Sequence, residues 1–264
     1  MIKRSSLYTF RWYAKQLLLR AQKTDDKIAM KAARELIEHL SVALGDEIIS
    51  NATKPKTKLK PIGDCTLGVV VGHTKNSRGA HSDYLNGVRE YDYWSEFADI
   101  LVKYGNSLGV KVVVEKRNDG GIKGAYLRLK KHKPDAFIEL HFNSFKSPKA
   151  TGTEVLYCNH FDEKGLNEIV FASMISKAMA DITGLPMRHS ATVNGKRVQG
   201  LKTIAKKGER GYYNLMQTIK TPSILTEPFF GSNPDDSKAF DDNKNKVAKA
   251  MIEAFIAWMN EAKS

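Results

Sequence analysis

The chain has little cysteine and no long apolar run, and these absences exclude several classes of protein. Cys65 and Cys158 are the two cysteines among 264 residues, too few for a disulfide framework and without metal-binding spacing. We expect two buried thiols, with one disulfide as the alternative. No stretch approaches the roughly 18–20 apolar residues of a transmembrane helix. The first twenty residues also lack an uninterrupted apolar segment, because Arg11 and Lys15 break it, so we expect no secretory signal peptide.

Positive charge, by contrast, is abundant and predicts an anionic partner. The chain has 42 Lys and Arg against 29 Asp and Glu, a net charge of +13. Nucleic acid, a lipid surface and an acidic polymer all fit this charge. We do not expect nucleic acid, because no recognised nucleic-acid-binding motif accompanies the charge.

The N-terminal part of the chain differs from the rest in pattern and charge. Residues 1–60 hold 13 Lys or Arg against 6 Asp or Glu. Apolar residues recur at helical spacing from Leu7 to Ala21 and from Ile28 to Leu40, which predicts a helical hairpin within residues 1–50. Four lysines and two prolines in residues 51–64 predict an extended basic linker. Residues 65–264 then form the main domain.

From Thr66 onward, short β-rich runs alternate with helical patterns, which is typical of an α/β fold with a mostly parallel sheet. The expected strands are "TLGVVVG", "VKVVVEK", "DAFIELHF", "GTEVLYC" and "PSILTE". The expected helices cover about 88–107, 122–131, 165–182 and 234–258. In such sheets, ligands bind outside the carboxyl ends of the strands.

Three polar residues lie at those strand ends. His73 follows the first strand, His141 ends "AFIELH" and Glu227 closes "SILTE". Of the remaining histidines, His39 belongs to the N-terminal helix, His132 to a basic helix end, and His81, His160 and His189 to loops. We therefore expect His73, His141 and Glu227 to lie at one site.

Glu90 joins this set by a separate argument. It shares one helical face with Trp94, Phe97 and Leu101, so we expect it to be partly buried against the sheet. A buried carboxylate needs a cation or several hydrogen-bond donors, and a metal ion is one such cation. Two imidazoles, one carboxylate and a water make up a hydrolytic zinc site, in which Glu227 is a candidate general base.

Each of these residues also has an ordinary structural interpretation, and spacing leaves it open. His73 could be a loop histidine bonded to backbone, and His141 a core histidine. Glu90 would then pair with a lysine or arginine, and Glu227 would be structural.

Four motifs occur in the order and at the spacing of a known family: "VVVGH" followed by "RGA", "NGVREYD", "ELHFNS" and "PSILTEPFFGSNPDD". Through them, residues 66–259 resemble the zinc-dependent N-acetylmuramoyl-L-alanine amidases of the amidase-3 family. The resemblance implies a mixed sheet of about six strands flanked by helices. It also implies one Zn²⁺ per chain on His73, Glu90 and His141, with Glu227 as the catalytic glutamate. The implied reaction cleaves the amide between N-acetylmuramic acid and L-alanine in peptidoglycan.

The chain departs from the family pattern at several positions. Thr74 stands where a second glycine is usual, and Pro228 stands where a small residue is common. Glu139 also replaces a small residue and shares a strand face with His141 and Asn143. Glu139 either forms a hydrogen bond with a metal ligand without binding the metal itself, or pairs with a nearby lysine. We favour the pairing with lysine. Asn143 is a candidate substrate-binding residue.

Residues 187–211 hold seven Lys or Arg against one acid, and their glycines predict a mobile loop over the site. Arg197 and Arg210 are candidates there for binding stem-peptide carboxylates or anionic wall polymers. A solvated basic loop is the alternative.

Together these features predict a monomeric, wall-degrading amidase, with a phage endolysin as the favoured origin. It would be made in the host cytoplasm and reach the wall after release; a cytoplasmic or spore-associated bacterial amidase would have similar features. The alternatives are a zinc carboxypeptidase or endopeptidase and a wall-binding module without turnover. We expect the basic N-terminal region to bind the wall or an anionic membrane surface.

Overall fold

The computed structural model describes residues 65–158, 163–193, 196–204 and 221–262, together with Ile28, Ala29, Ala32 and Leu36. The chain divides into two compact units, Met1–Lys58 and Leu59–Ser264. The four described residues of the first unit are helical. The rest of the predicted hairpin, and the basic linker as far as residue 64, lie outside the described residues and stay predictions.

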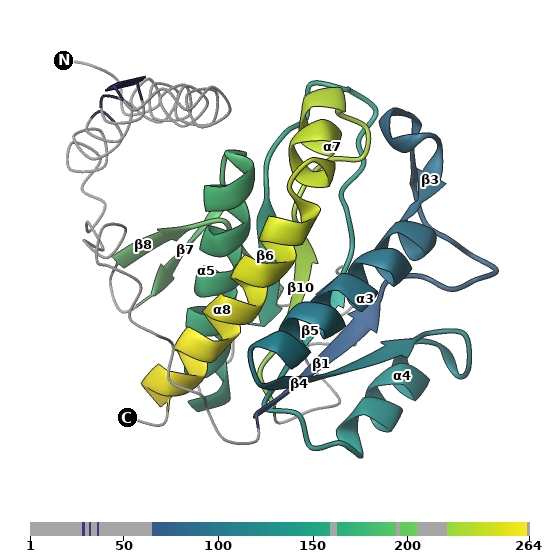
Figure 1. Ribbon diagram of the computed structural model, residues 1–264, viewed down its shortest axis with the longest axis vertical. Helices are drawn as coiled ribbons and strands as arrows, with labels where there is room; N and C mark the ends of the chain where they lie inside the picture. The colour runs from purple at the N-terminus through teal and green to yellow at the C-terminus, as the bar shows by residue number, and fades with distance from the viewer. Residues whose placement is uncertain are drawn as a thin grey trace. The chain divides into compact units, whose positions relative to one another are not determined.

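The second unit is built on a six-stranded sheet in the order β4-β1-β5-β10-β6-β9 (Figure 1). Neighbouring strands are parallel except β10 and β6, which are antiparallel. The prediction of a mixed, mostly parallel sheet is therefore confirmed. The strands are β1 (Cys65–Val71), β4 (Val110–Lys116), β5 (Ala136–Leu140), β6 (Glu154–Cys158), β9 (Leu201–Ile204) and β10 (Ser223–Glu227).

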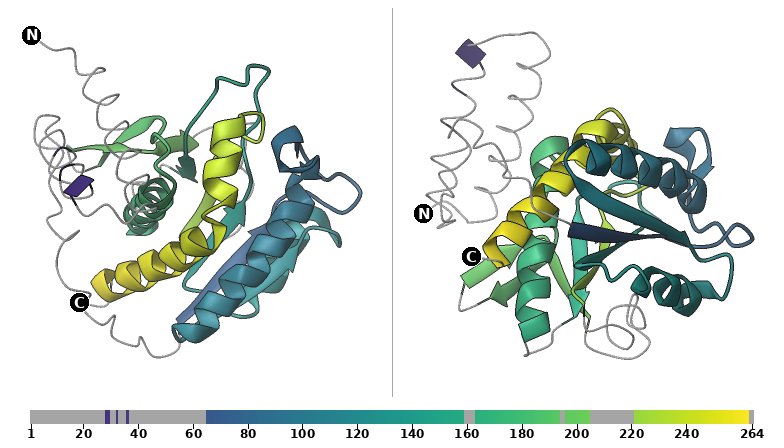
Figure 2. Two further views of the ribbon diagram at one scale, coloured as in Figure 1. Left: turned by 45° about the horizontal axis from the view of Figure 1, so that its top comes forward. Right: turned by 60° about the horizontal axis from the view of Figure 1, so that its bottom comes forward.

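Helices cover both faces of this sheet, which explains why its central strands are buried and largely apolar. The helices α3 (Glu90–Ser107), α5 (Glu163–Thr183) and α8 (Lys244–Ala262) pack on one face, where Val69 and Val71 join the main core. The helix α4 (Gly121–Lys130) covers the other face and packs on Val70 and Phe137. Figure 2 shows α3 and α4 on opposite sides of the sheet.

The prediction of one long C-terminal helix is wrong, because the chain forms α7 (Pro234–Asp241) and then α8. Asn233 caps the start of α7 by accepting hydrogen bonds from the N–H groups of Asp235 and Asp236. At the break, the Asn243 side chain donates to the Ala239 carbonyl oxygen at 3.0 Å. Such local side-chain bonds compete with the helical pattern.

The prediction of a single basic loop is also wrong over residues 190–204. This segment forms the antiparallel ribbon β7 (Ser190–Val193) and β8 (Lys196–Gln199), followed by the sheet strand β9. Both cysteines are buried thiols, as expected. Within the described part of the chain, no helix has the length and apolarity needed to cross a bilayer.

Candidate metal centre

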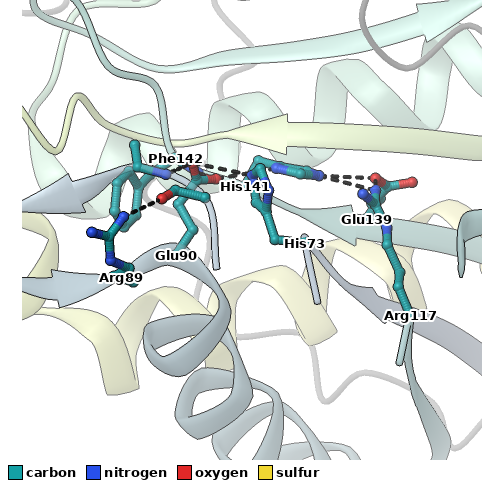
Figure 3. A network of polar contacts seen from close by, with 9 residues as sticks. His73, Arg89, Glu90, Arg117, Glu139, His141 and Phe142 are labelled. Atoms are coloured by element: carbon teal, nitrogen blue, oxygen red, sulfur yellow. Dashed lines mark hydrogen bonds and ion pairs between the residues drawn. The ribbon is translucent and has the colours of Figure 1, made fainter. Parts of the chain in front are cut away.

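The three predicted ligands converge at the carboxyl edge of the sheet, where their side chains point toward one another (Figure 3). His73 follows β1, His141 follows β5 and Glu90 is the first residue of α3. One ligand atom from each lies within 4.8 Å of the other two. Among the residues that the structure describes, this is the one cluster of three or more His, Cys, Asp or Glu side chains with such geometry.

Glu90 lies at the centre of the cluster and is 2% exposed. Its Oε1 is 3.3 Å from His73 Nε2 and accepts the Ala80 N–H at 3.0 Å. Its Oε2 is 3.1 Å from His141 Nδ1 and accepts the Phe142 N–H at 3.2 Å. Burial by itself raises the pKa of Glu90, but the hydrogen bonds and charges of His141 and His73 outweigh it and hold this pKa well below its ordinary value. The site therefore presents a carboxylate anion.

The start of α3 places this carboxylate. The Glu90 N–H donates to the Ala80 carbonyl oxygen and the Tyr91 N–H to that of Arg78, each at 3.0 Å. Trp94 and Phe97 anchor the same helical face in the core, as the spacing predicts. The helix N-terminus also favours a negative charge at this position.

Two glycines allow the imidazoles to approach. A Cβ at position 72 would lie 2.6 Å from His141 Cε1, and one at Gly79 would lie 2.5 Å from His73 Cδ2. Gly79 has a φ of +80°, which L-residues other than glycine rarely adopt. His73 itself has a φ of 63°, a strained conformation of the kind found at functional sites.

The cluster fits a zinc ion. Each imidazole nitrogen lies close to one oxygen of Glu90, His73 Nε2 3.3 Å from Oε1 and His141 Nδ1 3.1 Å from Oε2, and one ligand atom from each residue lies within 4.8 Å of the other two. Two nitrogens and one carboxylate oxygen are also the donor types of catalytic zinc sites. The His73 side chain is 26% exposed, whereas its Nε2 and the other two side chains of the cluster are buried.

Glu227 ends β10 and is fully buried beside the cluster. The His141 N–H donates to the Thr226 carbonyl oxygen at 3.1 Å, so Glu227 follows directly alongside His141. On its other side, Glu227 pairs in register with Glu154 of β6. Three neighbouring strands thus place a metal-ligand candidate, the predicted catalytic glutamate and a second glutamate in one row.

Sequence reasoning missed the surroundings of Glu154. This buried carboxylate contacts Arg188 Nε at 3.1 Å, His189 Nε2 at 2.9 Å and the Asn143 side-chain amide at 3.0 Å. Asn143, predicted to bind substrate, therefore has its amide nitrogen bonded to Glu154. An acid within the otherwise apolar "EVLYC" is the signal that could have identified this group.

Glu139 is fully buried on the far side of His141 (Figure 3). Its Oε1 lies 2.9 Å from His141 Nε2, its Oε2 accepts the Tyr126 hydroxyl at 2.9 Å, and it forms an ion pair with Arg117. Glu139 thus makes both kinds of contact that were considered, one with His141 and one with a cation. Among the described contacts, this cation is an arginine, where a lysine was expected.

The remaining candidates are not among the three clustered side chains. Arg197 is an exposed residue of β8 whose Nε donates to the Ser190 hydroxyl at 2.7 Å. Arg210 lies outside the described residues. His81 is exposed and pairs with Asp83 at 3.2 Å, which agrees with its exclusion from the ligand set.

Comparison with known proteins identifies the family. Residues 68–257 match the N-acetylmuramoyl-L-alanine amidase family. A Staphylococcus saprophyticus protein described as "Probable cell wall amidase LytH" is 25% identical over 206 residues, which cover 76% of this chain and 61% of that relative. The chain thus spans about three fifths of its relative's length.

Solved structures share the fold. Ami1, an N-acetylmuramyl-L-alanine amidase from Mycobacterium smegmatis, has a TM-score of 0.59 at 18% identity, over 76% of this chain and 99% of that one. The catalytic domain of the CD27L endolysin, which targets Clostridia difficile, has a TM-score of 0.55 at 22% identity, over 74% of this chain and 98% of that one. With its family match over most of its length, this chain belongs to the N-acetylmuramoyl-L-alanine amidase family.

Proposed function

We propose that this chain is a zinc-dependent N-acetylmuramoyl-L-alanine amidase that cleaves peptidoglycan. The bond cut is the amide between the lactyl group of N-acetylmuramic acid and the L-alanine of the stem peptide. The observation that carries the proposal is the convergence of His73, Glu90 and His141 beside Glu227 in a member of this family.

Different residues of the chain bind the metal and transfer the proton during hydrolysis. His73, Glu90 and His141 would hold the zinc, which would supply a Lewis acid for the amide carbonyl and lower the pKa of water. Glu227 takes a proton from the attacking water as its oxygen bonds to the lactyl carbon. It then gives that proton to the L-alanine nitrogen as the C–N bond breaks, which yields a carboxylic acid and an amine.

A basic recess beside His73 is the proposed route for substrate. Its volume is about 450 Å³, and its lining includes Arg78 and Arg89. Stem peptides carry carboxylates, which arginine binds well. Asn143, Arg197 and Arg210 stay candidate contacts for the same substrate or for anionic wall polymers.

A dye-release assay on purified sacculi tests this function. We expect solubilisation that a chelator abolishes and added zinc restores. Mass spectrometry of the products should find intact stem peptides beginning with L-alanine. Fragments cut within the stem would instead indicate a carboxypeptidase or endopeptidase, and no metal-dependent release would indicate a wall-binding module.

Three alanine variants test the roles. Glu227→Ala should keep zinc and lose most turnover, because it removes a base and no ligand. His141→Ala should lose both, whereas His81→Ala, the same change at an exposed imidazole outside the cluster, should lose neither. If Glu227→Ala emptied the metal site, the assignment of Glu227 as the base would be wrong.

We further propose that the protein acts on the cell wall as a phage endolysin released from the host cytoplasm. The basic composition and the family support action on an anionic wall. Expression in a host with and without a pore-forming membrane protein tests this: lysis should require the pore, and lysis without it would contradict release by that route. A monomeric state and a wall-binding or membrane-binding N-terminal region stay predictions.

A further inference from the structure

We infer that Glu139, held by Arg117 and Tyr126, is a positioning residue for the metal ligand His141. The inference rests on the proposed function, because it requires His141 to hold the metal. Glu139 is fully buried, and its two oxygens face His141 and Tyr126. It therefore lies where it can fix the His141 ring without being a ligand itself.

The two ring nitrogens of His141 face different partners. Nδ1 lies 3.1 Å from Glu90, and Nε2 lies 2.9 Å from Glu139. Nδ1 is thus the atom offered to a metal, and a neutral ring then carries its proton on Nε2. Glu139 can accept that proton in a hydrogen bond. Arg117 Nη2 is also 3.1 Å from Nε2, but a guanidinium only donates, so it cannot replace the carboxylate.

A carboxylate behind a metal-binding histidine fixes the tautomer and the ring orientation, and it strengthens the nitrogen as a donor. Glu139 can do so only as an anion in a site with almost no water. Arg117, which is 8% exposed, supplies the opposite charge, and the Tyr126 hydroxyl supplies a further hydrogen bond. The described contacts of Glu139 with His141, Arg117 and Tyr126 thus all fit a carboxylate that accepts a hydrogen bond from Nε2.

Stability alone is a weak reason for this arrangement. A buried ion pair is often no more stabilising than well-packed apolar side chains of the same volume. The chain also contains a partly exposed pair, Glu115 of β4 and Arg128 of α4, at 2.7 Å. Because the described contact of Glu115 is with Arg128 and not with a metal-ligand candidate, Glu115 is a matched control.

The test compares metal affinity in variants of the full chain. Glu139→Leu alone would leave Arg117 buried without this partner, so the decisive variant is the double change Glu139→Leu with Arg117→Leu. Zinc affinity, measured by competition with a chromogenic chelator, should fall about 10–100-fold. Glu139→Gln, which keeps an acceptor oxygen but loses the charge, should show a smaller loss. Glu115→Gln should bind zinc as tightly as the unmodified chain.

Thermal unfolding with and without zinc separates positioning from general stability. A ligand that binds the folded state raises the melting temperature according to its affinity. If Glu139 positions His141, the double variant should lose much of the zinc-induced rise. If Glu139 is merely structural, both melting temperatures should shift together and the rise should be unchanged.

The outcomes also separate this inference from the proposed function. If the double variant folds and binds zinc with unchanged affinity while the unmodified chain binds zinc and hydrolyses sacculi, the inference is wrong and the function stands. If the unmodified chain binds no zinc, the metal-dependent function fails and the inference fails with it.

Discussion

Gly79→Ala is expected to impair the metal centre by displacing His73. The new Cβ would lie 2.5 Å from His73 Cδ2 and 2.6 Å from Nε2, whereas non-bonded carbons prefer about 3.5–4.0 Å. The imidazole must therefore move by about 1 Å. Metal–ligand distances tolerate only about ±0.2 Å, so zinc affinity should fall at least about tenfold. The φ of +80° adds a backbone penalty of about 1–2 kcal/mol to the folded state.

Gly87→Ala separates these two effects. Gly87 has a φ of +71°, and nothing lies within 4 Å of a Cβ built there. It should therefore show the same backbone penalty of about 1–2 kcal/mol with normal zinc affinity. Urea denaturation of the metal-free proteins measures the penalty, and chelator competition measures the affinity. Equal zinc affinity in the two variants would refute the claim that Gly79 makes room for the His73 ring.

Two further predictions concern stability. Phe240→Ala removes a fully buried ring stacked 4.8 Å from Phe229. This change should lower the free energy of unfolding, measured by urea denaturation, by about 3–5 kcal/mol. As a control, Leu127→Ala, at an exposed position, should change the free energy of unfolding by less than about 0.5 kcal/mol. Burial raises the pKa of Asp236 above its ordinary value of 3.8, despite the hydrogen bonds that this carboxyl group accepts. The raised pKa contributes to the free energy of unfolding in full below pH 3.8, and this contribution is lost as the pH rises through the folded-state pKa. Asp236→Asn should remove this part of the pH dependence of unfolding, and equal pH slopes for the two proteins would contradict it.

The principal site residues could be predicted because parallel strands gather their carboxyl ends at one edge. Three apolar runs, now β1, β5 and β10, are each ended or followed by a polar residue: His73, His141 and Glu227. Glu90 could be added because its helical face is otherwise apolar. The structure brings the two imidazoles and Glu90 together and lays Glu227 in the strand beside His141.

Contacts that depend on register across several strands could not be predicted in the same way. Glu154 lies beside Glu227 only because β6 runs antiparallel to β10, and no local pattern indicates this direction. The strand β9 and the ribbon of β7 and β8 were also missed, since their basic and glycine-containing sequence is typical of a loop. There the pairing partners, and not local propensity, determine the structure.

Register also explains why Arg117 is the partner of Glu139. Lys116 pairs with Val71, and Val71 pairs with Leu140. The next residues of the three strands are Arg117, Gly72 and His141, which form the following row. Because Gly72 has no side chain, Arg117 can extend across β1 to the Glu139 carboxylate, whereas a larger residue at position 72 would meet His141 Cε1 at 2.6 Å. Gly72 thus leaves room both for His141, the metal-ligand candidate, and for Arg117, the cation that pairs with Glu139.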